Sequence, residues 1–176
     1  MEDDFLTGFA PIAGDKARIL ILGSMPSVAS LALGRYYGHP RNRFWPVMAA
    51  LFPDSAEALL SSDFDRRYDA LRANDVALWD TIGRCRRTGS LDSAIRDWTP
   101  NDVAGLLRSH PEIGTVVLNG KTSEAVWRKS RMSESLGERK SLRILTLPST
   151  SPANAAFGLE RLVTCWREAL QDKNEA

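Results

Sequence analysis

The amino-acid sequence predicts an α/β protein, a three-layer α/β/α sandwich with a central four-stranded parallel sheet. Two observations lead to this fold class. Four short runs are apolar at almost every position, which is typical of parallel strands covered on both faces. Segments with helical periodicity separate these runs, and strands that alternate with helices indicate a parallel sheet between helical layers.

The four strands are expected, in chain order, at residues 18–22, 76–79, 115–118 and 142–147. A helix is expected between the first two strands, where Phe44 and Trp45 begin a segment that Met48 and Leu51 continue. These four side chains share one face of such a helix, so we interpret Phe44 and Trp45 mainly as core residues.

Helices are also expected after the second, third and fourth strands. Before the third strand, Thr99 is a candidate N-cap, Pro100 suits the first helical position, and Asp102 supplies an early acid. After the third strand, Lys121 begins another helix. The last helix repeats apolar residues on one face at Leu159, Leu162, Val163, Trp166 and Leu170.

Length and composition predict one soluble domain. The 176 residues suit a single domain over residues 1–176, with residues 171–176 as a frayed tail. Hydrophobic residues make up 43% and charged residues 26% of the chain, an ordinary globular balance. No apolar run approaches the roughly 18 residues of a membrane span, and the acidic N-terminus lacks a signal pattern. We therefore expect a cytoplasmic protein without a membrane partner.

The cysteine and histidine content argues against a metal site. Cys85 and Cys165 lie far apart, and neither has a second cysteine at metal-ligand spacing. With only His39 and His110 to assist them, a structural zinc site is not expected. We expect no metal and no cofactor, two reduced thiols, a core position for Cys165, and activity that persists in excess EDTA.

The net charge of +1 says nothing about DNA binding, but the distribution of charged residues along the chain does. The acid-free segment between Asp15 and Asp54 holds Lys16, Arg18, Arg35, Arg41 and Arg43. A second acid-free run, residues 81–91, holds Arg84, Arg86 and Arg87. Two cationic surfaces of this kind can dock a phosphate backbone. For any single arginine, simple solvation of the surface is the alternative.

Four loops are expected to meet at one edge of the sheet, because ligands of open α/β sheets bind beyond the carboxyl ends of the strands. These loops are residues 23–27, 80–83, 119–121 and 148–152. All are rich in Gly, Pro and small hydroxyl residues, which allow close backbone approach and anion binding by N–H groups.

The motifs in these loops resemble the uracil-DNA glycosylase superfamily, and most of all its hypoxanthine-DNA glycosylase branch, the sixth family. The resemblance is carried by residues 23–27 (GSMPS), 36–46 (YYGHPRNRFWP) and 147–154 (LPSTSPAN), with residues 78–82 and 89–92 in support. The motifs occur in the family order and cover nearly the whole chain. The resemblance implies the glycosylase fold and a monofunctional, water-dependent enzyme that acts on a base flipped out of DNA.

Two catalytic positions of the superfamily are blank in this sequence. Most branches carry Asp or Asn where Met25 stands, and His or Asn where Leu147 stands. Neither apolar side chain can orient water or donate to a departing base. The resemblance to the hypoxanthine branch implies that Asn42 is the important catalytic residue; the alternative is a turn residue favoured after Pro40.

The base pocket is expected to contain Gly23, Ser24, Met25, Tyr37, Asp80 and Asn119. Asp80 matches the position that reads the base edge in related branches, and its carboxylate can accept N1–H of hypoxanthine or N3–H of uracil. The alternative for Asp80 is an N-cap or a partner for an arginine. Tyr36 and Tyr37 offer an aromatic face for stacking on the base, or else belong to the core.

The DNA contacts are expected from Ser27, His39, Arg41, Arg43, Ser149 and Ser151. Serine hydroxyls and backbone N–H groups can bind phosphates, although ordinary turns use the same residues. His39 can contact phosphate or move a proton, or pack beside Pro40. Lys121 is interpreted as structural or phosphate-facing. Related enzymes insert a bulky residue from the last loop into the duplex, whereas Ser151, Pro152 and Ala153 are all small.

The expected function is hydrolysis of the N-glycosidic bond of a deaminated base in DNA, above all hypoxanthine. The expected partner is DNA that contains such a base, and the enzyme is expected to act as a monomer. Two alternatives stay open: a glycosylase of the same fold that acts mainly on uracil, and a nucleic-acid-binding module without catalysis, which Met25 invites.

Overall fold

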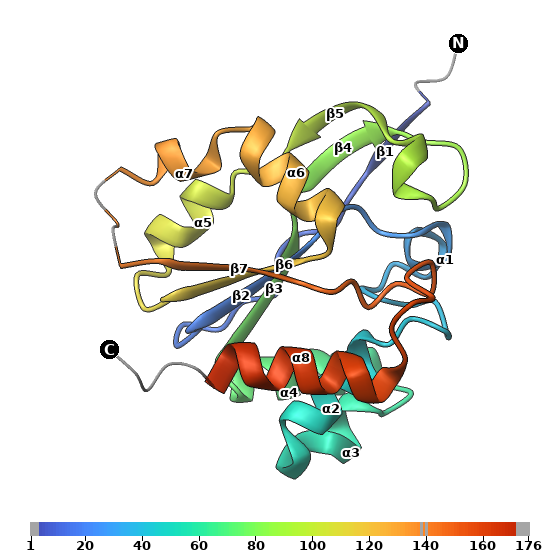
Figure 1. Cartoon of the computed structure of the whole chain (residues 1–176), viewed down its shortest axis with the longest axis vertical. Coiled ribbons are helices and arrows are strands. Elements are labelled where there is room, and N and C mark those ends of the chain that lie inside the picture. Colours follow the sequence, from blue (N-terminus) through green and yellow to red (C-terminus); the bar gives the residue numbers. More distant parts are fainter. Residues whose placement is uncertain (1–3, 138, 140, 172–176) are drawn as a thin grey trace.

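The central sheet is parallel and has the strand order β3-β2-β6-β7 (Figure 1). Its strands are β2 (Ile19–Gly23), β3 (Val76–Asp80), β6 (Thr115–Asn119) and β7 (Arg143–Leu147). They confirm the four predicted strands, each displaced by no more than one residue at either end. The structure is a computed structural model, and it describes residues 4–137, 139 and 141–171.

Helices cover both faces of this sheet. One layer holds α2 (Phe44–Leu51), α3 (Ala56–Leu59), α4 (Phe64–Ala73) and α8 (Leu159–Gln171). The other holds α5 (Val103–Ser109), α6 (Lys121–Lys129) and α7 (Met132–Ser135). The short helix α1 (Val28–Leu33) follows β2, and the 3₁₀ turns η1 (Pro53–Ser55) and η2 (Asp92–Ala94) complete the helical segments. Figure 1 shows the two layers below and above the sheet, which confirms the predicted α/β/α sandwich.

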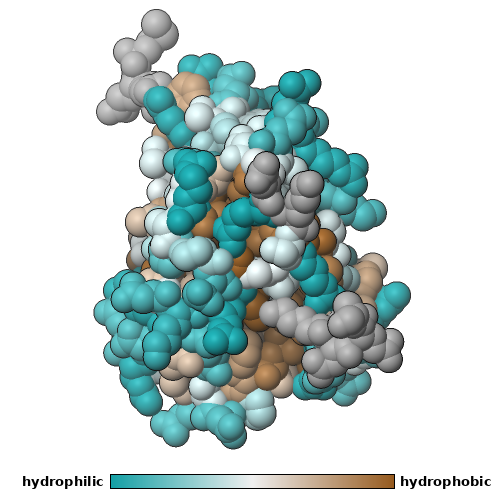
Figure 2. Space-filling view, turned by 90° about the vertical axis from the view of Figure 1, so that its left-hand side faces the viewer, coloured by the Kyte–Doolittle hydropathy of each residue, from teal (hydrophilic) through white to brown (hydrophobic). Residues whose placement is uncertain are grey.

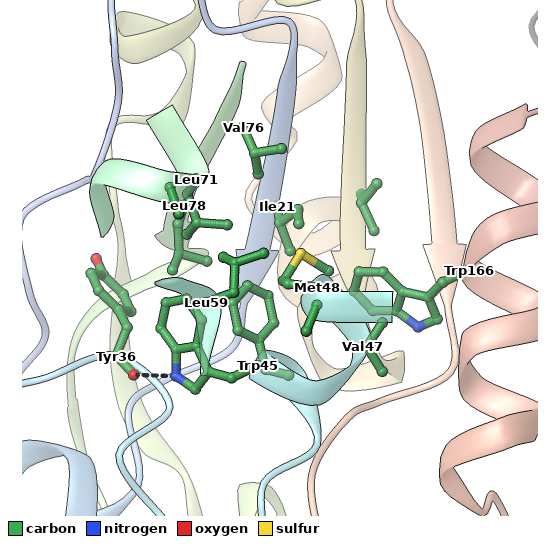
Figure 3. Packing of buried hydrophobic residues seen from close by; sticks show 14 of the residues in the cluster. Ile21, Tyr36, Trp45, Val47, Met48, Leu59, Leu71, Val76, Leu78 and Trp166 are labelled. Carbon is green, nitrogen blue, oxygen red and sulfur yellow. Dashed lines mark hydrogen bonds between the residues drawn. The ribbon is translucent and has the colours of Figure 1, made fainter. Parts of the chain in front are cut away.

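The core consists of two apolar clusters because successive strand residues point to opposite faces. Ile21 packs in the cluster under α2, α4 and α8, whereas its neighbours Leu20 and Leu22 pack in the cluster under α5 and α6. Figure 3 shows the first cluster, in which the Trp45 indole nitrogen donates to the Tyr36 carbonyl oxygen at 3.3 Å. Phe44 and Trp45 are both buried, as expected from the sequence.

A second, smaller sheet was not predicted. It is antiparallel, has the order β1-β4-β5, and contains β1 (Phe5–Thr7), β4 (Ile82–Arg86) and β5 (Arg96–Pro100). Strand β4 combines the buried residues Ile82 and Cys85 with the exposed residues Arg84 and Arg86, and most of β5 is exposed. Such strands are too polar to be recognised from continuous apolar runs.

Two details at helix ends differ from the sequence predictions. The helix expected from Thr99 begins only at Val103, because the Asp102 side chain accepts the Gly105 N–H at 2.8 Å and is the true N-cap. Thr99 and Pro100 instead end β5, an edge strand in which proline is tolerated. Gln171 is the last residue of α8 rather than part of a tail, and residues 172–176 of that prediction lie outside the described residues.

The side of the molecule on which β7 begins faces the viewer in Figure 2. Its surface is largely hydrophilic, with a band of hydrophobic residues between the polar ones. In the part of the chain that the structure describes, no helix combines the length and the apolar character needed to span a membrane. The carboxyl ends of the parallel strands lie on the opposite side, where the candidate site is found.

Candidate active site

A cavity of about 820 Å³ lies at the carboxyl ends of the parallel strands. The four loops that were expected to meet at this edge all contribute to its wall. Its polar and glycine lining includes Gly23, Ser24, Asn42, Asp80, Asn119, Ser149 and Ser151. Residues 90–92 form a further part of the wall. They were assigned no role from the sequence, although residues 89–92 were part of the family resemblance.

Asp80 is the most unusual group in this cavity. The residue is 4% exposed, and among the described residues its Oδ2 atom has no hydrogen-bond partner. Burial raises the pKa of this carboxyl to about 7; the negative charge of Asp92 adds to the rise, and the positive charge of Arg87 opposes it. Near neutral pH, Asp80 therefore exists in both its ionised and its neutral form.

Gly23 makes room for this carboxyl. The two residues are register partners in the pairing of β2 with β3. A Cβ atom on residue 23 would lie 2.4 Å from Asp80 Oδ1 and 2.9 Å from Tyr37 Oη. Because a real Cβ atom essentially never lies within 3.0 Å of such a neighbour, a side chain at position 23 would force the Asp80 carboxyl and the Tyr37 hydroxyl to move.

Asn119 connects three segments of the wall. Its Nδ2 donates to Tyr37 Oη at 3.0 Å and to Thr150 Oγ1 at 3.1 Å, and its Oδ1 accepts the Thr150 N–H at 3.1 Å. Both amide hydrogens are thus used within the protein. The structure places Asn119 in the predicted pocket but gives it an organising position rather than one with a donor for a base.

The two tyrosines have different surroundings. Tyr37 stacks on Phe44, with ring centroids 4.0 Å apart, and its backbone is left-handed with φ of 50°. The Tyr37 hydroxyl oxygen accepts a hydrogen bond from Asn119 Nδ2. Burial raises the pKa of this hydroxyl, so it stays protonated. Tyr36 belongs to the core cluster, and its hydroxyl donates to the Ala10 carbonyl oxygen at 2.7 Å. The core alternative therefore applies to the Tyr36 side chain.

Asn42 lines the cavity, and its side-chain oxygen already accepts a hydrogen bond within the protein. Its Oδ1 accepts the Phe44 N–H at 2.9 Å at the start of α2, and its own N–H donates to the His39 carbonyl oxygen at 2.9 Å. Within the described part of the chain, its Nδ2 has no hydrogen-bond partner. The group that Asn42 offers to a ligand is consequently a donor.

The Arg43 guanidinium is not displayed toward solvent for a phosphate. It donates to the carbonyl oxygens of Thr150 at 3.3 Å, Ser151 at 2.6 Å and Asn154 at 3.0 Å, and also to that of Phe157. Four of its five N–H donors are thereby occupied. The predicted DNA contact of Arg43 is corrected: this side chain fastens the loop after β7 to the segment before α2.

Other predicted DNA contacts lie on the surface near the cavity. Arg41 is exposed. The His39 Nδ1 accepts the Arg41 N–H at 3.1 Å, which in the neutral ring places the hydrogen on Nε2. Ser27 caps α1 by accepting the Ser30 N–H at 3.1 Å. Ser149 and Ser151 accept the N–H groups of Ser151 and Ala153 at 3.1 and 3.2 Å, as in ordinary turns.

The second arginine run does not form one cationic surface. Arg87 is buried, with Nε donating to the Gly89 carbonyl oxygen at 2.8 Å and Nη2 to that of Pro26 at 2.5 Å. Arg84 and Arg86 both lie over the Phe5 ring, and Arg86 pairs with Asp97 at 3.3 Å. Arg87 contributes instead to the electrostatics of Asp80.

The two positions that lack the polar catalytic residues of the superfamily pack against apolar neighbours. Met25 is buried in a cluster with Ile82, Cys85 and Val126, and Leu147 is buried in the main core. Both cysteines are free thiols; Cys85 is buried, whereas Cys165 is only half-buried, so it is less enclosed than expected. Among the described residues, no three His, Cys, Asp or Glu side chains are grouped as metal ligands.

Comparison with known proteins gives consistent matches over most of the chain. The family model for the uracil DNA glycosylase superfamily matches residues 11–171. A protein of Methanosarcina barkeri named hypoxanthine DNA glycosylase is 34% identical over 145 residues, which is 77% of this chain and 90% of the relative. A protein of the same name from Methanosarcina acetivorans is 33% identical over 154 residues, 88% of this chain and 91% of the relative.

A solved structure supports the likeness in three dimensions. It is the solution NMR structure of a candidate uracil DNA glycosylase from Methanosarcina acetivorans. The two chains are 27% identical and superimpose with a TM-score of 0.75, covering 95% of this chain and 99% of the other.

Proposed function

Since the chain belongs to the uracil DNA glycosylase superfamily, we propose that it removes hypoxanthine from DNA by hydrolysing the N-glycosidic bond of deoxyinosine. The observation that carries this proposal is the buried Asp80 carboxyl, whose Oδ2 has no partner among the described residues of the cavity wall. A buried polar atom without a partner is costly unless a ligand satisfies it.

Asp80 suits the edge of hypoxanthine by its chemistry. That edge presents the N1–H donor beside the C6 carbonyl acceptor. A neutral carboxyl offers one O–H donor and one carbonyl acceptor side by side, so it matches both groups at once. A pKa of about 7 keeps much of Asp80 neutral below that pH, and the O–H then donates to the C6 oxygen as the base leaves with negative charge.

Asn42 supplies a second donor. Its Oδ1 is held by the Phe44 N–H, which fixes the amide plane, and its Nδ2 has no partner in the described part of the chain. We propose that Nδ2 donates to the departing base, where it stabilises charge that develops only in the transition state. Water then adds to C1′ of the sugar cation, which the DNA phosphates stabilise. The proton that this water loses balances the negative charge of the departing base, so the products are neutral hypoxanthine and an abasic sugar, without a covalent enzyme intermediate.

DNA binding is proposed to involve the surface around the cavity mouth. Arg41 and His39 supply a charge and a donor, and Ser27, Ser149 and Ser151 lie in the adjacent loops. Action as a monomer stays a prediction from the sequence. The cytoplasmic location stays a prediction from the sequence.

The same carboxyl fits uracil, whose N3–H and carbonyl oxygen form a similar edge, so uracil is the second candidate substrate. Strand nicking by alkali tests both on duplexes that carry deoxyinosine, deoxyuridine or deoxyxanthosine, with an unmodified duplex as the control. We expect nicking at deoxyinosine above the other lesions. Preferential nicking at deoxyuridine would replace hypoxanthine by uracil, and binding without nicking of any duplex would support a non-catalytic module.

A further inference from the structure

Leu91 is an exposed leucine at the wall of the base cavity. The residue is 61% exposed, the highest value among the large hydrophobic residues that the structure describes. The other strongly exposed leucines, Leu33 and Leu60, do not line the cavity. Figure 1 shows the lime-coloured segment between β4 and β5 on the same side of the molecule as α1 and the loop after β7.

The residues on both sides of Leu91 are held to the loop after β2. The Val28 N–H donates to Ser90 Oγ at 3.0 Å, and the Ser24 hydroxyl donates to the two carboxylate oxygens of Asp92 at 2.9 and 3.0 Å. The backbone at Leu91 is fixed as well, because its carbonyl oxygen accepts the Ala94 N–H at 3.0 Å. The chain thus holds a large apolar side chain in a defined place without burying it.

Arg87 also holds the Leu91 segment against the loop after β2. Its guanidinium joins the Gly89 carbonyl oxygen of the Leu91 segment to the Pro26 carbonyl oxygen of the loop after β2. A segment held at three points loses little further conformational entropy when it meets a partner. Preorganisation of this kind is expected of a binding element rather than of a loop that only connects two strands.

We propose that the Leu91 side chain enters the DNA base stack and occupies the space left by the nucleotide whose base lies in the cavity. This inference rests on the proposed function. Leucine is one of the apolar side chains that DNA-binding proteins insert between base steps, where bases flank it on both sides and exclude water. Extrusion of a base leaves an apolar gap beside the cavity mouth, and Leu91 is the exposed leucine of the cavity wall.

The other cavity residues fit this role less well. In the loop after β7, Ser151, Pro152 and Ala153 are too small to fill the space of a base. Phe157 also lines the cavity, but it is half-buried and packs in the core, and Arg161 lies over its ring at 4.2 Å. The wedge therefore comes from the segment between β4 and β5.

The test compares excision from duplex and single-stranded DNA by Leu91→Ala, Leu91→Met and the wild type. Only the duplex requires a filled gap, so Leu91→Ala is expected to slow single-turnover excision from the duplex by roughly tenfold to a hundredfold, the range set by loss of one buried leucine side chain. Excision from the single strand is expected to stay within a few-fold of the wild type. Leu91→Met restores duplex excision, and Leu60→Ala, at a leucine 53% exposed away from the cavity, changes neither rate.

A binding measurement separates this inference from the choice of substrate. A duplex with a stable tetrahydrofuran abasic analogue offers the gap without any base to excise. The wild type is expected to prefer this duplex over an intact one, and Leu91→Ala to lose the preference. If the wild type shows the preference but releases no hypoxanthine, the proposed substrate fails and the wedge stands. Equal effects of Leu91→Ala on single-stranded and duplex DNA, or an unchanged preference for the abasic duplex, would overturn the wedge.

Discussion

The carboxyl group of Asp80 lies where a side chain on Gly23 would have to stand, with Oδ1 only 2.4 Å from the position of the absent Cβ. The two residues face each other at the ends of paired parallel strands, β2 and β3. The carboxyl that we propose to contact the base is thus placed by main-chain pairing, and the absence of a side chain at position 23 leaves room for it.

Gly23→Ala is expected to displace Asp80 and Tyr37 from the cavity wall. A displacement of about 1 Å at a reacting group costs roughly a hundredfold in rate, so single-turnover excision should fall by that order. Gly114→Ala is the matched control, because a Cβ there meets nothing within 4 Å. An active Gly23→Ala enzyme would show that Asp80 does not need its present position.

The excision rate of the wild type is expected to fall as the pH rises through about 7. The pKa of Asp80 is raised to about 7 by burial, with Asp92 adding to the rise and Arg87 opposing it, so the neutral form that donates to the base is lost above this pH. Single-turnover rates from about pH 5 to about pH 9 measure this. A rate that rises through neutrality would mean that the ionised carboxylate is the active form.

Asp80→Asn is expected to retain excision and to flatten this pH profile. An amide presents a donor and an acceptor as the neutral carboxyl does, but it does not titrate. Asp80→Ala lacks both groups and is expected to lose activity by roughly a hundredfold or more. Equal loss of activity in both variants would argue against hydrogen bonds between residue 80 and the N1–H and C6 oxygen of hypoxanthine.

The same substitution is expected to change stability with a definite sign. Because the folded-state pKa of Asp80 lies above the ordinary value of 3.8, the free energy of unfolding falls as the pH rises from about 4 to about 7. Asp80→Asn removes this penalty, so its melting temperature should exceed that of the wild type more at about pH 8 than at about pH 5. A difference independent of pH would contradict the raised pKa.

Asn42 is tested by a pair of variants. Asn42→Asp keeps the oxygen that accepts the Phe44 N–H and replaces the Nδ2 donor, whereas Asn42→Ala removes both. Each is expected to slow excision by roughly a hundredfold to a thousandfold, and only Asn42→Ala to cost about 0.5–1.5 kcal/mol of stability through loss of the hydrogen bond from the Phe44 N–H. A rate within a few-fold of the wild type for Asn42→Asp would reject donation by Nδ2.

Arg41 and Arg43 are expected to separate into a DNA contact and a structural residue. Arg43→Ala leaves several carbonyl oxygens without their donor and is expected to cost about 2–4 kcal/mol of stability. Arg41→Ala is expected to keep stability, weaken binding to damaged and undamaged duplexes alike, and reduce the salt dependence by about one counterion. Thermal melting and binding at several salt concentrations distinguish the two; unchanged stability of Arg43→Ala would restore it as a candidate phosphate contact.

The sequence predicted the main sheet and the family because buried parallel strands and the motif strings are continuous in the chain. The same reasoning could not predict the second sheet, since β4 and β5 are polar strands that depend on pairing with each other. It also misjudged Arg43, because a cationic side chain looks alike in sequence whether it meets phosphates or the carbonyl oxygens of a loop more than a hundred residues away.

The place of Leu91 was missed for a related reason. Leu91 stands among polar residues in the sequence. Its position at the cavity depends on Ser24 and Val28, which lie more than sixty residues earlier in the chain and form hydrogen bonds with the residues on either side of it. The raised pKa of Asp80 likewise needs burial and the proximity of Asp92 and Arg87. Residue type suggests the chemistry, but only the fold decides which atoms are already occupied.

The hydrogen bonds of Asn119 have a consequence for biosynthesis. They join Tyr37 to Thr150, so the cavity needs segments from both ends of the chain, and the loop that holds Thr150 emerges late from the ribosome. The β2–β6 pairing is also non-local, which delays folding until much of the chain exists. A nascent chain that ends before this loop lacks the Thr150 groups that bind Asn119, so this part of the cavity wall can be completed only after residue 150 has been added.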